Sequence, residues 1–406
     1  MKQGWEIKKL GDITTSINGL WTGKKPPFIT IAVIRNTNFT KDCKLDTSDI
    51  AYIDVEVKQY ASRKLQCGDI IIEKSGGSDK QPVGRPILFN IEEGEYSFSN
   101  FTSTLRVSDK TTILPEFIHR YLAYIYMRGD TAAMQSKTTG IRNLDFNLYK
   151  SINIPVPPRE EQERIVAELD CLSGVIERKR EQLRELDALA QSIFYQMFGD
   201  PITNEKGWET SQFDNACELI TDFVAAGSFA DIKHNVKYID RPDFAQLIRT
   251  TDIKNQFTKS DYVYVSESAF NYLWRVKLDK ESIILPNVGN CGEVYYITPT
   301  MLPYKNNVLG PNAILVRSNK ENNRYLSFLF KTSYFQYQLR TIVNAVGQPK
   351  FNKTALKQLS VILPPLTLQQ KFADKIEAIE KQKELIKQSI TQTEELFNSR
   401  MDYYFN

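Results

Sequence analysis

The sequence IPVPPREEQERI at residues 154–165 returns in altered form as VILPPLTLQQKF at residues 361–372. In both copies a double proline comes directly before a long stretch that is rich in helix formers and free of proline. Proline fits the first turn of a helix but breaks its interior. The sequence therefore predicts two long helices, over residues 158–199 and 364–406.

Both predicted helices carry an apolar stripe whose members recur at alternating steps of four and three residues. This heptad spacing is typical of coiled coils, and a helix of 35 to 40 residues is about 55 Å long. Antiparallel pairing about the midpoints would place Lys179 opposite Ile390 and Lys383 opposite Leu186. The alternative is that each helix packs only on its own globular domain. The stripe consists of Ile165, Leu169, Leu172, Ile176, Leu183, Leu186 and Ile193 in the first helix, and of Phe372, Ile376, Ile379, Ile386, Ile390 and Phe397 in the second.

The rest of the chain repeats in the same order. The tripeptide GWE occurs at residues 4–6 and 207–209, and the pair Ile34-Arg35 is matched by Ile248-Arg249. Because the matches keep their order and nearly constant spacing, chance does not explain them. The chain is predicted to be two copies of one unit.

These patterns predict an α+β fold with two tandem domains, residues 1–157 and 200–363. Each domain alternates short β-rich runs with turn residues and holds one amphipathic helix, near residues 117–128 or 323–339. The two long helices are expected to form an antiparallel coiled coil that relates the domains by a pseudo-two-fold axis and separates them like a rod.

Composition excludes several classes of protein. Hydrophobic residues make up 41% of the chain, and no apolar run approaches the roughly 18 to 20 residues of a membrane span. The first residues, MKQGWEIKKLGDI, lack the apolar stretch of a signal peptide. Five scattered cysteines, never in CxxC spacing, favour a reduced, cytoplasmic protein. With only two histidines, no metal site is predicted.

The sequence predicts no catalytic residue. Neither a Gly-rich dinucleotide or S-adenosylmethionine loop nor a GxxxxGK[ST] motif is present. His119 is interpreted as a structural histidine and His234 as a residue of a polar loop. Glu56 and Lys58 could form the Glu-x-Lys of a metal-dependent nuclease, with Asp46 or Asp49 as a second carboxylate. Such a trio arises easily by accident in a chain that is 25% charged, so a solvated strand face is favoured.

Both domains are mildly basic and carry Gly-containing polar loops at matched positions. Residues 1–157 hold 21 Lys and Arg against 17 Asp and Glu, and residues 200–363 hold 19 against 16. This charge is small for a protein that binds DNA alone, so partners are implied. The side-chain types in these loops and nearby can bind bases and phosphates. The candidate DNA-binding residues are Arg35, Lys74, Ser75, Ser78, Lys80, Arg85, Lys137, Thr138, Arg142, Asn143, Arg249, Asn287, Asn290, Gln348, Lys350 and Asn352.

Four motifs resemble the specificity subunit of type I restriction-modification systems, and the resemblance covers nearly the whole chain. The most specific are the junction IPVPP at residues 154–158, with Glu161-Gln162, and the exit MFGDP at residues 197–201. The other two are GWE followed by LGDI at residues 10–13, and GDII at residues 68–71 before a Gly-containing loop. The second copy departs from this pattern, because it has Glu281-Ser282 in place of Gly-Asp and lacks the Glu-Glu before Gln369.

The resemblance implies two target-recognition domains, each of which reads one half of a bipartite double-stranded DNA site. It also implies that the helices act as spacer and dock two methyltransferase subunits. Those partners would carry S-adenosylmethionine and methylate adenine, and nuclease-translocase restriction subunits could join them. No cofactor is expected on this chain itself. The alternatives are a fused nuclease or modification enzyme and a coiled-coil scaffold that never binds DNA.

Overall fold

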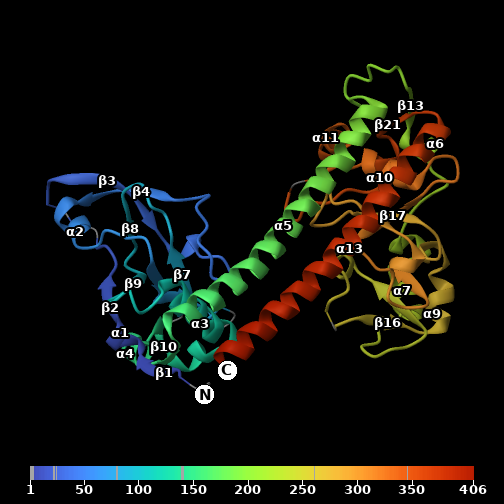
Figure 1. Cartoon of the computed structure of the whole chain (residues 1–406). Coiled ribbons are helices and arrows are strands. Elements are labelled where there is room, and N and C mark those ends of the chain that lie inside the picture. The colour runs from blue at the N-terminus through green and yellow to red at the C-terminus, as the bar shows by residue number, and fades with distance from the viewer. Residues whose placement is uncertain are drawn as a thin grey trace. The chain divides into compact units, whose positions relative to one another are not determined.

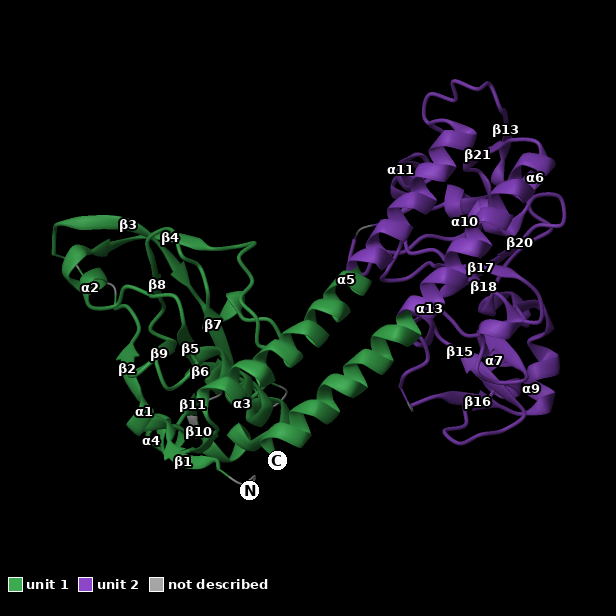
Figure 2. Ribbon diagram, in the orientation of Figure 1, with its two compact units in different colours: residues 1–180, 387–406 green, residues 181–386 purple. Residues whose placement is uncertain are grey.

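The computed structural model describes residues 4–21, 23, 25–78, 81–138, 141–259, 261–344 and 346–406. The chain forms two compact units, which Figure 2 shows in different colours. The first unit comprises residues 1–180 and 387–406, and the second comprises residues 181–386. Helices α5 (Arg159–Phe198) and α13 (Leu366–Phe405) each contribute one half to each unit. Within the described ranges, no helix is both long and apolar enough to cross a membrane.

The first unit is built from short strands and short helices that cover them (Figure 1). Its strands are β1 (Glu6–Lys9), β2 (Thr14–Asn18), β3 (Phe28–Ile34), β4 (Ala51–Glu56), β5 (Asp69–Glu73), β6 (Ser75–Gly77), β7 (Pro86–Phe89), β8 (Tyr96–Phe98), β9 (Thr102–Val107), β10 (Gln135–Thr138), β11 (Ile141–Leu144) and β12 (Asn153–Val156). Its short helices are α1 (Leu10–Ile13), η1 (Asn36–Asn38), α2 (Val57–Ala61), α3 (Pro115–Arg128), η2 (Asp130–Met134) and α4 (Phe146–Lys150).

The second unit repeats this construction. Its strands are β13 (Glu209–Gln212), β14 (Leu219–Asp222), β15 (Ala245–Ile248), β16 (Val263–Val265), β17 (Ser282–Pro286), β18 (Tyr295–Ile297), β19 (Asn307–Leu309), β20 (Ala313–Arg317) and β21 (Ser360–Leu363). Its short helices are α6 (Phe213–Ala216), η3 (Phe223–Ala226), α7 (Phe229–Asn235), α8 (Thr250–Lys254), α9 (Glu267–Tyr272), η4 (Trp274–Val276), η5 (Pro299–Met301), α10 (Asn323–Leu329), α11 (Ser333–Ile342) and α12 (Lys353–Lys357).

The sheets confirm the internal repeat. The pair β1-β12 matches β13-β21, and the four-stranded sheet β2-β9-β5-β7 matches β14-β20-β17-β18. The mixed sheet β4-β3-β8 matches β16-β15-β19, and in both the central strand has one antiparallel and one parallel neighbour. Shared strand order and shared direction in three sheets confirm that the chain is two copies of one α+β unit.

The predicted β-rich runs are strands, but one of the predicted helices is interrupted and forms two helices. In the first unit the expected helix at residues 117–128 is α3. In the second unit the helix expected over residues 323–339 is broken between α10 and α11. The break lets Phe330 stack on Phe335, with ring centroids 4.4 Å apart, while both rings contact Phe213. Burial of these three rings outweighs the hydrogen bonds of one continuous helix.

Helices α5 and α13 pair in antiparallel orientation within each unit, as predicted. In the first unit Lys179 Nζ donates to Ser389 Oγ at 2.5 Å, and in the second Lys383 Nζ donates to Asp187 Oδ1 at 2.7 Å. The register is within one residue of the expected one. The partners differ, because each lysine meets polar atoms where an apolar side chain was expected. All members of the predicted stripe are buried or half-buried.

The ends of the long helices pack on the globular cores instead of on each other alone. Ile165 and Leu169 are fully buried in the core of the first unit, and Phe194, Phe198 and Phe372 are fully buried in that of the second. At these ends the buried apolar face of each helix is therefore wider than the predicted heptad stripe. Pairing of the helices and packing on their own domains, considered as alternatives from the sequence, both occur along the same helices.

One glutamine joins each long helix to its globular core. Gln162 is fully buried; its Oε1 accepts from Leu114 N at 2.8 Å, and its Nε2 donates to Thr112 O and Pro157 O, each at 2.9 Å. The matched Gln369 is also fully buried, accepts from Asn322 N and donates to Pro364 O. The glutamine that follows each double proline thus holds the helix to the preceding loop through backbone atoms.

Replacing this glutamine is expected to loosen the junction. Gln162→Leu removes three hydrogen bonds of a buried side chain, which corresponds to about 3 kcal/mol of unfolding free energy. Urea unfolding of the purified protein measures the loss, with the exposed neighbour Glu163→Gln as control. Equal stability of the two variants would contradict this role of Gln162.

Candidate nucleic-acid interface

In the first unit the fold brings together the two polar loops that the sequence marked separately. Strands β6, β11 and β10 form one small sheet in which Arg142 lies opposite Gly77 and Asn143 opposite Ser75. Ser75 Oγ donates to Asn143 Oδ1 at 2.6 Å. Ser75, Arg142 and Asn143 are half-buried, and Ser78 is exposed just beyond β6.

The second unit joins its two loops in the same way with fewer strands. Bridges connect Lys350 to both Val288 and Asn344, and Asn287 Nδ2 donates to Phe351 O at 3.1 Å. Three candidate side chains at this place are exposed, namely Asn290, Gln348 and Lys350. Asn352 is also exposed, but its Oδ1 caps α12 by accepting from Ala355 N at 2.8 Å. Each unit therefore presents one composite polar surface.

Several candidate residues are engaged in the fold. Arg35 and Arg249 occupy matched positions, and their guanidinium groups pair with Asp49 at 3.4 Å and Asp252 at 2.6 Å. Lys74 Nζ donates to Asn18 Oδ1 at 2.9 Å, and partial burial lowers the pKa of its ammonium. Lys80 lies outside the described residues, as do the side chains of Lys137 and Thr138.

Arg85 requires a correction, because it does not reach the surface. It is 4% exposed, pairs with the buried Glu73 at 3.2 Å and donates to Phe39 O at 2.8 Å. Burial raises the pKa of the Glu73 carboxyl, while Arg85 opposes that shift. An arginine held between buried acceptors has a structural role and is not available to DNA.

The carboxylates of the nuclease alternative do not converge. Glu56 Oε1 accepts from Lys25 N at 2.6 Å, Asp46 Oδ1 accepts from Ser48 N at 2.9 Å, and Asp49 pairs with Arg35. Among the residues that the structure describes, no group of three His, Cys, Asp or Glu side chains could hold a metal ion. The geometry does not support this alternative.

His119 is a structural histidine, as predicted. The ring is buried on α3, and Nε2 lies 3.0 Å from Cys43 O, to which it can donate. Burial, with a contribution from the nearby Arg120 cation, lowers its pKa from 6.5 to about 4.

This depressed pKa predicts acid sensitivity of the first unit. Below pH 6.5 the unfolded histidine binds a proton, whereas the folded one stays neutral until about pH 4. The stability contributed by neutral His119 is present above this window and falls by about 3 kcal/mol as the pH falls through it. His119→Gln, which keeps a donor for Cys43 O, is expected to lose less over the same window. Urea unfolding at several pH values measures both slopes, and identical slopes would contradict the assignment.

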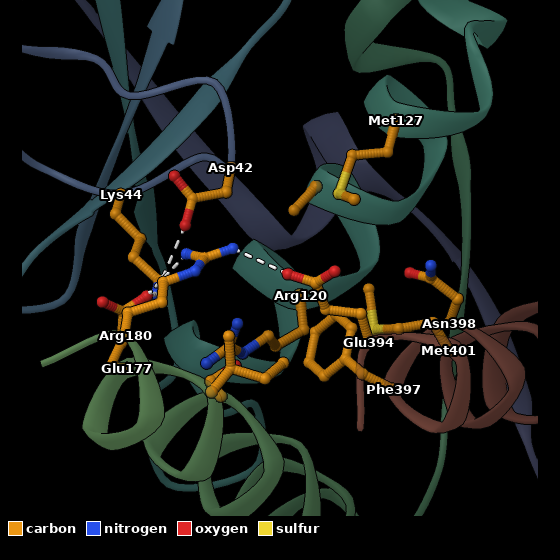
Figure 3. A pocket seen from close by; sticks show the side chains of 13 residues that line it. Asp42, Lys44, Arg120, Met127, Glu177, Arg180, Glu394, Phe397, Asn398 and Met401 are labelled. Carbon is orange, nitrogen blue, oxygen red and sulfur yellow. Dashed lines mark hydrogen bonds and ion pairs between the residues drawn. The ribbon is translucent and has the colours of Figure 1, made fainter. Parts of the chain in front are cut away.

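Each unit also has a cavity where its globular part meets the paired long helices. The first, shown in Figure 3, has a volume of about 220 Å³ and lies among α3, α5 and α13. Its charged side chains pair with one another: Lys44 with Glu177 at 2.9 Å and Arg180 with Glu394 at 2.8 Å. The second cavity, of about 280 Å³, lies among α10, α5 and α13.

The two cavities occupy equivalent places in the repeat. The first is lined by residues 394, 397, 398 and 401, and the second by residues 187, 190, 191 and 194. These sets are separated by the same interval as residues 154–165 and 361–372. Each unit therefore has an equivalent cavity.

Two copies of one family model match the chain, at residues 2–188 and 205–395, and its description is "Type I restriction modification DNA specificity domain". The chain belongs to this family of type I specificity subunits and carries two recognition domains in tandem.

Among similar proteins is the type I restriction enzyme StySPI specificity subunit of Salmonella potsdam, which is 24% identical; the match covers 93% of this chain and 82% of that protein. A solved structure of a type I R-M system contains a similar chain; the match covers 100% of this chain and 98% of that chain, with a TM-score of 0.55 and 15% identity. The match to the type I restriction-modification system S subunit from M. genitalium covers 98% of this chain and 95% of that chain, with a TM-score of 0.52 and 13% identity. These structures share the fold.

Proposed function

We propose that each unit reads one half of a bipartite DNA site and that this chain directs partner methyltransferase subunits to the site without catalysing methylation itself. The observation that carries the proposal is the composite polar surface in each unit. In one unit Ser75 bonds to Asn143 of a separate loop, and at the matched place in the other unit Lys350 pairs with Val288 and Phe351 O accepts from Asn287. Two related reading surfaces suit two half-sites.

The repeated cavities support two copies of one methyltransferase as partners. A partner that binds at the cavity of one unit can bind in the same way at the equivalent cavity of the other unit. Those partners supply S-adenosylmethionine and transfer its methyl group to adenine, and restriction subunits with nuclease and translocase activity can join the complex. The modest positive charge of each domain agrees with binding that depends on partners.

Reconstitution tests this function. The purified chain alone is expected to transfer no methyl group, whereas addition of its methyltransferase partner gives adenine methylation at one bipartite sequence. Methylation of a random-sequence DNA library, mapped by sequencing with and without each component, measures this. Methyl transfer by the single chain, or methylation without sequence preference by the complete complex, would contradict the proposal.

A further inference from the structure

The ends and the apolar stripe of the long helices do not by themselves explain why α5 pairs with α13. The ends make equivalent contacts, because the ring centroid of Phe198 lies 4.8 Å from that of Tyr325, and the ring centroid of Phe405 lies 5.5 Å from that of the matched Tyr121. The stripe runs along both helices. These features would let α5 pair with α5 of a second copy as well as with α13 of its own chain.

Lys179 is a charged residue within the 4-3 spacing of the stripe of α5. Its side chain is half-buried, and its ammonium donates to Ser389 Oγ at 2.5 Å and to Thr393 Oγ1 at 3.1 Å, both on α13. A lysine within an apolar stripe can specify the register and the partner of a helix at some cost in stability. The counterpart of Lys179 in α13, at the interval that separates the two double-proline motifs, is the apolar Ile386. The two copies of the repeat therefore differ at this position.

Glu168 makes a second polar contact between α5 and α13. Its half-buried carboxylate accepts from Arg400 Nη2 at 3.1 Å and from Tyr404 Oη at 2.6 Å. These hydrogen bonds from Arg400 and Tyr404 lower the pKa of the Glu168 carboxyl. The counterpart of Glu168 in α13 is Lys375, which has the opposite charge. The repeat is therefore asymmetric at this position as well.

The residues of α13 that bond to Lys179 and Glu168 are not reproduced in α5. Three of their four counterparts in α5 are apolar, so most of these hydrogen bonds cannot form between α5 and α5 of a second copy. Because such a pair would be symmetric, each loss would occur twice. A half-buried charge without its partners costs free energy. The four residues of α13 are Ser389, Thr393, Arg400 and Tyr404, and their counterparts are Gln182, Leu186, Ile193 and Met197, in that order.

We propose that Lys179 and Glu168 make α5 select α13 of its own chain and reject α5 of a second copy. The apolar stripe supplies the attraction, and the two charged side chains determine the partner. Both recognition domains then stay in one molecule when other copies are present. The inference goes beyond the proposed function and does not depend on it, because it concerns helix pairing alone.

Pairing in a cleaved chain tests the proposal, because an intact chain favours its own helix through effective concentration alone. A protease site inserted between Glu205 and Lys206, both exposed in the turn region after α5, allows the folded protein to be cut into two halves. Cleaved protein with a tag on its first half is mixed with cleaved untagged protein and left to exchange in mild urea. Capture of the tag followed by native mass spectrometry counts the first halves bound to a second half and those bound to another first half.

Replacement of both charged side chains of α5 is expected to change the partner. The wild type should give almost only pairs of a first and a second half. In Glu168→Leu/Lys179→Leu, pairs of two first halves should rise at least about tenfold, because no charge is left without a partner in such a pair. The matched control is Arg184→Leu/Glu185→Leu, which also removes one base and one acid of α5. Both control residues are exposed, and Arg184 pairs with Glu181 of the same helix, so wild-type pairing is expected.

A second variant leaves the first half unchanged. Ser389→Gln/Thr393→Leu gives α13 the residues that α5 has at the matched positions, so Lys179 loses its hydroxyl partners. Pairs of two first halves should rise about threefold or more, because the preferred pair is weakened. Wild-type pairing in both this variant and Glu168→Leu/Lys179→Leu would overturn the proposal. Abundant pairs of two first halves in the wild type, or an equal rise in the control, would overturn it as well.

Discussion

Exchange of residues 1–157 for the matching segment of another family member is expected to replace one half of the methylated sequence and to leave the other half unchanged. Each unit has its own hydrophobic cores, and none of these clusters mixes residues of the two units. Each mismatched base pair costs about 1 to 3 kcal/mol, so even two changed base pairs lower methylation of the original site about 30-fold or more.

The junction is suited to this exchange, because Gln162 binds its loop through backbone atoms that a foreign domain also provides. Side chains of the exchanged segment also meet α13: the Phe117 ring lies 5.6 Å from that of Phe405, and Tyr124 Oη donates to Asp402 at 2.8 Å. The donor segment should therefore keep aromatic residues at these two positions. Sequencing of methylated libraries measures the result, and a chimera that is folded and active but has both half-sites altered would argue against independent reading.

Asp69→Ala is expected to cause a large loss of stability in the first unit. The Asp69 carboxylate is fully buried and accepts from Arg106 Nε and Nη2, both at 2.7 Å, and from Gln66 N at 2.8 Å. These bonds raise the pKa of the guanidinium. Removal of one partner of a buried ion pair costs about 3 to 5 kcal/mol, and the lower value is expected here because Arg106 is partly exposed.

The second unit supplies a matched control for this substitution. Where the first has Asp69, the second has Ser282, whose Oγ accepts from Arg317 Nε at 2.9 Å, while Asp279 provides the opposite charge at 3.1 Å. The departure from the Gly-Asp motif therefore keeps the arginine paired. Ser282→Ala should cost less, about 1 to 2 kcal/mol, because the two hydrogen bonds of this neutral hydroxyl are lost, one from Arg317 and one to Lys280 O. Urea unfolding compares the variants, and equal losses would show that the Asp69 ion pair does not carry the stability of its sheet.

The architecture was predictable because its signals are local. Duplicated motifs define the repeat, and the spacing of four and three residues defines both the long helices and the register in which Lys179 and Lys383 meet their partners. The β-rich runs also needed no tertiary information, since short runs of β-branched and apolar residues between turn residues indicate strands even where, as in β5 and β17, every position is buried.

Only the tertiary structure decided which polar residues form a site. By its residue type Arg85 is a candidate DNA contact in the sequence. In the fold, its side chain is buried and pairs with Glu73. Ser75 and Asn143 are far apart in the chain and meet because β6 pairs with β11. The sequence by itself determined the repeat, the helices and their pairing, because these depend on periodic burial along one segment. The reading surfaces depend on contacts between distant segments, and those exist only once the sheets have formed.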